Sequence, residues 1–405
     1  MTATTDTEPE DLRNRMVDQI DAAGHLHSSS VEQALRTVPR HLFVPEASVE
    51  DAYANKAITT KPGGPGGRPA SCASVPTVMA MMLGQLDAQP GDRVLEIGAG
   101  TGYNAALLAE LVGENGEVIT IDIHPDVTAQ ARRALDASGY GGVRVLTGDG
   151  ALGAPDQAPF DRIIVTVGPW DLPPAWHDQL APGGFLVVPL HWRGQARSVA
   201  FVHEDGVLRA RDSRLCGFIP MIGDGQDGEH TGHIGDDVAL YWDNDQPIDP
   251  AALHGVLAQP EATVWSGASV VPNESTDPIW LRLTGTEPGT CRFAAEPAAV
   301  DSGLCNPAFT HRSPALVERD SLAYLTLRGP DPDATERRWQ LGAIGHGPDG
   351  AQLAERLCEQ IRTWDHDRTA QPVITAYPAG TADQELAAGP VIDKQHIRLV
   401  VSVPG

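Results

Sequence analysis

A glycine-rich turn between a buried strand and a helix is the strongest chemical signal in the sequence. Residues 92–100 (DRVLEIGAG) are typical of a buried strand that ends in a tight turn, and residues 103–113 (YNAALLAELVG) are typical of a helix. Glycines in such a turn let a ligand approach the backbone N–H groups at the start of the helix. The dinucleotide fingerprint needs glycine at the sixth position, where Tyr103 stands, so the turn favours a ligand without phosphates.

Two acidic residues follow at the ends of the next two predicted strands, 117–123 and 143–150. A carboxylate at Asp122 can accept hydrogen bonds from both hydroxyls of a ribose, and Ile123 can pack on an adenine face. Asp149 can accept a hydrogen bond from the adenine amine. Because the carboxyl ends of successive parallel strands share one rim of the sheet, these groups predict a site for S-adenosylmethionine. The alternatives are an ordinary strand-to-helix turn for the glycines and a solvated strand end for Asp122.

The elements that must position these residues alternate between strand and helix. This alternation predicts an α/β domain with a mostly parallel, Rossmann-like sheet and right-handed crossovers. Residues 198–215 predict an antiparallel hairpin after it. The domain is preceded by helices over 9–23 and 74–86 and by a helix from Ser29, where Glu32 completes a capping-box pattern.

A change of composition divides the chain near residue 225. We expect a catalytic domain over 1–225, a polar, Gly-rich linker over 226–237 and a second domain of α+β character over 238–405. Short strand-like segments dominate the second domain, among them IWLRLTG (279–285), with one clear helix over 351–367.

The composition narrows the possible partners. The formal net charge of −25, with only three lysines, disfavours nucleic acid, because nucleic-acid binding depends largely on Lys and Arg. No apolar run approaches the ~18 residues that span a membrane, and the polar N-terminus does not look like a secretory signal, so we expect a cytoplasmic protein. The five cysteines lack the spacing of a zinc site, and their odd number argues against a disulfide framework.

Five longer motifs point to one protein family. They are TVPRHLFVP (37–45), VLEIGAGTGYNAALLA (94–109), GDGALG (148–153), APFDRIIVT (158–166) and QLAPGGFLVVP (179–189). In these motifs the sequence resembles the protein-L-isoaspartate O-methyltransferases. The resemblance covers about residues 9–222, and TVPRHLFVP is its most distinctive motif.

The resemblance implies where substrate and cofactor bind. In that family a Thr-Ile-Ser-x-Pro segment closes over the cofactor and the substrate carboxylate; it matches 72–76 here, which makes Ser74 the active-site serine, with Ser71 assisting. A carboxylate is already ionised at neutral pH, so it needs no general base or metal to attack a sulfonium methyl, and the expected cofactor product is S-adenosylhomocysteine. The residues expected to bind the cofactor are Cys72, Thr77, Glu96, Gly98, Gly100, Asp122, Ile123, Asp149 and Gly150.

Three departures from the family pattern suggest a specialised substrate. They are Cys72 in place of threonine, the GGPGGRPAS insertion (63–71) and the long C-terminal extension. Together they resemble a bacterial branch that methylates an Asp side chain in constrained ribosomal peptides (lanthipeptides, lasso peptides and graspetides), giving aspartimide and sometimes isoaspartate. The first alternative is repair of isoaspartate in damaged proteins. The second is a non-catalytic scaffold or cofactor-binding protein.

Overall fold

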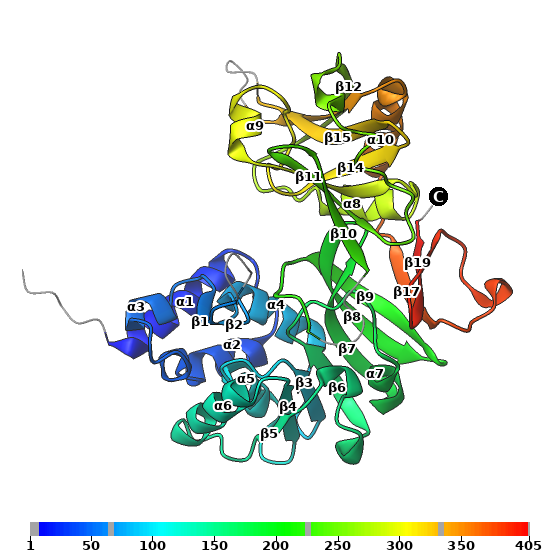
Figure 1. Ribbon diagram of the computed structural model, residues 1–405. Coiled ribbons are helices and arrows are strands. Elements are labelled where there is room, and N and C mark those ends of the chain that lie inside the picture. Colours follow the sequence, from blue (N-terminus) through cyan, green and yellow to red (C-terminus); the bar gives the residue numbers. More distant parts are fainter. Residues whose placement is uncertain (1–7, 64–68, 223–227, 331–335, 404–405) are drawn as a thin grey trace, which may run out of the picture. The chain divides into compact units, whose positions relative to one another are not determined.

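The computed structural model describes residues 8–63, 69–222, 228–330 and 336–403 (Figure 1). The chain divides into two compact units. The first comprises Met1–Leu190 and Arg197–Gln226, and the second comprises His191–Ala196 and Asp227–Gly405.

The first unit contains the predicted, mainly parallel sheet, with strand order β9-β8-β7-β6-β3-β4-β5. Strand β3 pairs in parallel with β4 and β6, β4 with β5, and β6 with β7, whereas β8 and β9 form the predicted antiparallel hairpin. The carboxyl ends of β3, β4 and β5 therefore lie along one rim. The bounds are β3 (Arg93–Ile97), β4 (Glu117–Asp122), β5 (Arg144–Thr147), β6 (Phe160–Val165), β7 (Leu180–Trp192), β8 (Gln195–Glu204) and β9 (Val207–Leu215).

Helices pack on this sheet around one apolar core. Met16, Leu35, Leu83 and Leu107 come from four different helices and are all buried there, together with Val94 of β3. The helices of the first unit are α1 (Pro9–Ala22), α2 (Ser29–Thr37), α3 (Val49–Ala52), α4 (Pro76–Leu86), α5 (Tyr103–Val112), α6 (Pro125–Ala137) and α7 (Pro174–Gln179), with 3-10 turns η1 (Arg40–Phe43), η2 (Gly150–Leu152) and η3 (Pro155–Gln157).

The start of α2 differs by one residue from the predicted capping box. The N-cap is Ser28, whose hydroxyl accepts a hydrogen bond from the backbone N–H of Val31. Ser29 is instead the first helical residue. Three consecutive serines (28–30) make the cap position ambiguous from sequence, because each of them is a good N-cap residue.

A two-stranded ribbon precedes α4 and leads into residues 72–76, the segment that contains Ser74 and is called the serine segment below. Strand β1 (Ile58–Lys61) pairs antiparallel with β2 (Ser71–Ala73) (Figure 1). In this pairing Thr59 lies opposite Cys72. Of the predicted insertion, residues 64–68 lie outside the described part of the chain.

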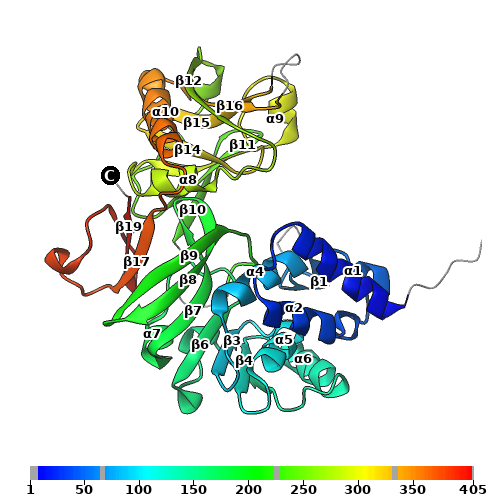
Figure 2. The same cartoon turned by 180° about the vertical axis from the view of Figure 1, so that it is seen from behind.

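The second unit is built on an antiparallel sheet with the order β10-β11-β13-β14-β15-β16-β12 (Figure 2). Its α+β character agrees with the sequence prediction. The seven strands of this sheet are β10 (Glu229–Gly235), β11 (Val238–Asp243), β12 (Ala262–Val270), β13 (Thr290–Ala295), β14 (Ser313–Glu318), β15 (Ser321–Arg328) and β16 (Trp339–His346). Three further strands of this unit are β17 (Val373–Pro378), β18 (Val391–Asp393) and β19 (Ile397–Ser402), and β19 pairs with both of the others. Its helices are α8 (Asp277–Thr284), α9 (Pro297–Asp301) and α10 (Gly350–His366), with 3-10 turns η4 (Val256–Ala258) and η5 (Asp383–Glu385).

Two local predictions in this half are wrong. Most of the expected linker is strand β10, which pairs with β11. Its residues are polar or glycine except for the buried Ile234, so the strand gives no hydrophobic alternation in the sequence. IWLRLTG, expected as a strand, lies mostly in helix α8. Pro278 lies in the first turn of this helix, and Ile279 and Leu283 are buried on one of its faces.

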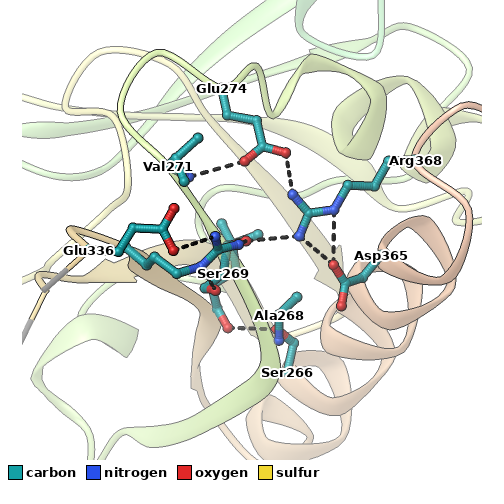
Figure 3. A network of polar contacts seen from close by, with 10 residues as sticks. Ser266, Ala268, Ser269, Val271, Glu274, Glu336, Asp365 and Arg368 are labelled. Atoms are coloured by element: carbon teal, nitrogen blue, oxygen red, sulfur yellow. Dashed lines mark hydrogen bonds and ion pairs between the residues drawn. The ribbon is translucent and has the colours of Figure 1, made fainter. Parts of the chain in front are cut away.

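A polar network fastens α10 to the end of β12 (Figure 3). The guanidinium of Arg368 contacts the carboxylates of Glu274 and Asp365 and donates a 2.8 Å hydrogen bond to the backbone carbonyl of Ser269. Arg338 donates to the Ser269 hydroxyl across 2.8 Å. Because one arginine serves both elements, the network fixes the end of the helix against the edge of the sheet.

Among the described helices, none is both long enough and apolar enough to cross a lipid bilayer.

Candidate active site

The glycine turn joins β3 to α5 in a conformation that requires glycine. Gly98, Gly100 and Gly102 have φ values of +101°, +50° and +85°, in the left-handed region. A Cβ atom on Gly98 would lie 2.6 Å from the Thr166 hydroxyl oxygen. The N–H groups of Gly98 and Ala99 donate to the carbonyl of Ile121, across 2.8 and 3.1 Å, which fixes the turn against the end of β4. The predicted strand–turn–helix motif is therefore present.

Asp122 connects the end of β4 to this turn. Its carboxylate accepts hydrogen bonds from the N–H of Gly100, across 3.2 Å, and from the N–H of His124, across 3.1 Å. Each carboxylate oxygen has two lone pairs, so both oxygens keep capacity for the two hydroxyls of a ribose. Ile123 beside it is 38% exposed, which leaves an apolar surface that fits a flat aromatic base.

Asp149 and Gly150 form the next part of the rim. Asp149 caps η2 by accepting a 2.9 Å hydrogen bond from the N–H of Ala151. A side chain on Gly150 would clash with Ile97, because the added Cβ would lie 2.5 Å from its Cγ2 atom. The indole N–H of the buried Trp176 donates to the carbonyl of Gly150 across 2.8 Å, so this tryptophan packs beneath the rim and holds its backbone.

Glu96 lies inside the sheet rather than on its rim. It is fully buried and accepts hydrogen bonds from Asn104 Nδ2, across 2.8 Å, and from the Thr120 hydroxyl, across 2.6 Å. Burial raises the pKa of its carboxyl to about 7, partly opposed by these two hydrogen bonds, and nearby Asp122 adds a smaller rise. Its observed contacts tie β3, β4 and α5 together below the glycine turn. Direct contact with a cofactor stays a prediction.

The serine segment lies next to the glycine turn, because the carbonyl oxygen of Cys72 is 3.7 Å from the position of a Cβ on Gly100. Ser71 is nearly buried, and its hydroxyl accepts a 3.1 Å hydrogen bond from Thr60. Within the described residues, no group hydrogen-bonds to the hydroxyl of Ser74. Helix α4 has Val75 as its N-cap, with no side-chain cap, so capping does not occupy that hydroxyl.

Cys72 and Thr77 flank this segment. Burial raises the pKa of the Cys72 thiol, which keeps it protonated at neutral pH. The Thr77 N–H and hydroxyl both donate to Asn55 Oδ1, across 3.1 and 2.9 Å, so a cofactor could use only the lone pairs of that hydroxyl.

Sequence analysis missed Arg40, which the structure places behind the serine segment. It is fully buried, donates to the carbonyl of Ala52 from Nε across 2.8 Å and to the carbonyl of Ser74 from Nη2 across 2.9 Å. Its guanidinium also lies 5.0 Å from the ring centre of Tyr103, the first residue of α5. The available signal was an arginine within the motif TVPRHLFVP, whose other residues are mostly apolar.

The described residues include no group of three or more His, Cys, Asp or Glu side chains arranged to hold a metal ion. The cysteines are free thiols.

Comparison with known proteins identifies relatives of the first unit. Residues 11–226 match the family described as protein-L-isoaspartate(D-aspartate) O-methyltransferase. The protein-L-isoaspartate O-methyltransferase of Methanopyrus kandleri is 42% identical over 214 residues, which cover 52% of this chain and 92% of that protein. That of Hyperthermus butylicus is 39% identical over 223 residues, covering 53% of this chain and 90% of that protein.

A solved protein-L-isoaspartate O-methyltransferase structure extends the likeness in fold to both halves. It covers 90% of this chain and 96% of its own, with a TM-score of 0.50 and 20% sequence identity. A protein of that name thus shares its fold with most of this chain, including the C-terminal extension. The family match spans just over half of the 405 residues, and the chain belongs to the protein-L-isoaspartate O-methyltransferase family of S-adenosylmethionine-dependent methyltransferases.

Proposed function

We propose that this protein methylates the free α-carboxylate of isoaspartyl residues in peptides or proteins. The observation that carries the proposal is the position of the serine segment. Its Cys72 carbonyl approaches Gly100, while the Ser74 hydroxyl is bonded to no other described group. A hydroxyl donor beside a glycine turn suits an enzyme that brings a carboxylate to a cofactor.

The residues of the rim suit S-adenosylmethionine, which supplies an electrophilic methyl group on a sulfonium. Asp122 would hold the ribose, Ile123 would pack on the adenine, and Asp149 would accept a hydrogen bond from its amine. Gly100 leaves room beside the backbone that a side chain would fill, Gly98 lets the turn pass close to Thr166, and Glu96 holds the turn from below.

Ser74 has one task in this chemistry, which is to orient the nucleophile. A carboxylate with a reference pKa of ~4 is already ionised at neutral pH, so a carboxylate oxygen can attack the methyl carbon without losing a proton. The new O–C bond forms as the C–S bond breaks, and the electron pair of that bond goes to sulfur. The negative carboxylate and the positive sulfonium both become neutral. A hydroxyl can direct the carboxylate without forming a close ion pair that would weaken the nucleophile.

A second substrate class is an Asp side chain in a constrained ribosomal peptide. Cys72 in place of threonine and the 63–71 insertion favour it, since both alter the segment that faces the substrate. After methylation, the next backbone nitrogen attacks the ester and releases methanol, which gives an aspartimide that water can open to Asp or isoaspartate. The isoaspartyl ester gives the same ring, so the two substrate classes differ in which carboxylate is methylated.

Three peptides with the same amino-acid composition would distinguish these functions. They are a linear isoaspartyl peptide, the linear Asp peptide and a cyclic Asp peptide, each incubated with S-adenosylmethionine and followed by mass spectrometry. Methylation of the linear isoaspartyl peptide alone is the expected result. Methylation of the cyclic Asp peptide alone, followed by a net loss of water, would assign tailoring instead. No methylation of any peptide would favour a non-catalytic protein.

We also propose that the second unit recruits the substrate. The curated relatives match about half of this chain along nearly their whole length, so they have no counterpart of the second unit. A chain that ends at residue 226, with the buried Trp192 replaced by serine for solubility, should still bind S-adenosylhomocysteine but have a higher KM for its peptide. An unchanged KM on the true substrate would refute recruitment.

A further inference from the structure

Arg40 is a buried cation without a carboxylate partner among the described residues. Besides the carbonyls of Ala52 and Ser74, its guanidinium has the Met79 sulfur, 3.9 Å from Nη1, and the face of Tyr103. Burial lowers its pKa, but an arginine remains protonated at neutral pH.

Burying this charge would destabilise the folded protein if Arg40 served only to bind two backbone carbonyl groups. A charge removed from water is destabilising unless an opposite charge compensates it, and neutral donors can also bind carbonyl groups. The positive charge therefore calls for a further explanation, and an anion that binds nearby would provide one.

The position of the charge indicates which anion this is. Arg40 bonds directly to the backbone of Ser74, and its ring contact is with Tyr103, directly after the glycine turn. The same charge acts on the Cys72 thiol, whose pKa it lowers against the larger rise caused by burial. The guanidinium thus lies behind the segment to which the substrate carboxylate is assigned.

The overall charge of the protein strengthens this argument. At a formal net charge of −25, the molecule as a whole repels an anionic substrate. A local cation at low dielectric opposes that repulsion at the point where the carboxylate must bind, because charges interact more strongly away from water.

We propose that Arg40 is a positioning residue that holds Ser74 in place and whose charge makes the site prefer an ionised carboxylate to a neutral ester. This proposal rests on methyl transfer to a carboxylate. Before the reaction the substrate carboxylate compensates the buried charge from a distance, without forming a close ion pair with it. Afterwards the ester is neutral and Arg40 is again without a counter-charge, so substrate binding is favoured over product binding.

Binding to the complex with S-adenosylhomocysteine tests the proposal without turnover. The probes are the peptide that the protein methylates and the same peptide with a neutral carboxamide in place of the carboxylate. We expect the wild-type protein to bind the carboxylate at least tenfold more tightly. Arg40→Met should reduce this ratio to about one with unchanged affinity for S-adenosylhomocysteine. Arg40→Lys should keep a ratio well above one but have a lower kcat, because a lysine cannot bond to Ala52 and Ser74 with the same fork.

Arg36→Gln is the matched control, because Arg36 lies on the same N-terminal segment but is paired with Asp18 and Glu32 at the surface. The preference of Arg36→Gln for the carboxylate peptide over the carboxamide peptide should equal that of the wild type. A wild-type ratio near one would overturn the proposal even if Arg40→Met fails to fold, and so would a folded Arg40→Met protein that keeps the preference. Loss of methylation with every peptide would instead refute the proposed function.

Discussion

The Thr120 hydroxyl donates a 2.6 Å hydrogen bond to Oε2 of Glu96, which joins neighbouring strands of the sheet directly beneath the glycine turn. The other oxygen of Glu96 accepts from Asn104 of α5. A fully buried carboxyl group therefore supports the glycine turn from below, and its contribution to the stability of the folded protein depends on pH.

Replacing Glu96 with glutamine should change how stability depends on pH. The folded pKa of Glu96 is about 7, above its ordinary value of 4.5, so the folded state binds the proton more tightly than the unfolded chain does. The stabilising contribution is complete below pH 4.5 and is lost as pH rises through 7, by at most roughly 3 kcal/mol. Glu96→Gln should reduce this loss. The measurement is the melting temperature of both proteins between pH 5 and 8; parallel curves would contradict it.

Ser74→Ala should lower kcat about ten- to a hundredfold, because the carboxylate would lose the donor that orients it. Affinity for S-adenosylhomocysteine should not change, since the Ser74 hydroxyl is assigned to the substrate. Steady-state kinetics and calorimetric titration check the two parts. A large loss of cofactor affinity would show that Ser74 belongs to the cofactor site.

Asp122→Asn should weaken binding of S-adenosylhomocysteine about tenfold, roughly 1.4 kcal/mol, because a neutral amide offers one acceptor oxygen where the carboxylate offers two. Asp136→Asn is the control, since Asp136 forms an exposed ion pair with Arg132 on the following helix. Equal affinities of the two variants in calorimetric titration would refute the ribose assignment.

Gly98→Ala should be far more damaging than Gly91→Ala, although both glycines have similar φ values of +101° and +92°. The Gly91 site has no atom within 4 Å of an added Cβ, so its substitution should cost only the backbone strain, about 1 kcal/mol. At Gly98 the added carbon meets Thr166, and the turn must shift. Chemical denaturation and cofactor titration of both variants would measure the difference, and similar losses would refute the steric argument.

The sequence was sufficient to predict the catalytic fold, because buried parallel strands and glycine turns leave strong local patterns. Gly98, Asp122 and Asp149 fall at the ends of successive strands, as their spacing predicted. The same logic fails for β10, where exposed His230 and His233 give no apolar alternation.

The missed part of the site depends on contacts between distant segments. Nothing local to Arg40 indicates that it reaches Ser74, which lies 34 residues further along the chain. Likewise, Glu96 resembles a rim residue in the motif VLEIGAG, but side-chain alternation turns it inward toward Asn104 and Thr120. Sequence patterns predict which elements form, whereas the partners of a single polar side chain depend on how those elements pack.

The second unit includes six residues, His191–Ala196, from the connection of the hairpin that β7 and β8 form, and this limits how it could have been inherited. Arg193 in that hairpin donates from its backbone N–H to the buried carboxylate of Asp243 across 2.9 Å, and its side chain pairs with Asp245. Trp192 donates to Thr284. A gene fragment that encodes only residues 227–405 would lack these contacts. The C-terminal half is therefore not a free-standing module, and recombination that transferred it to another protein would also have to supply a matching hairpin.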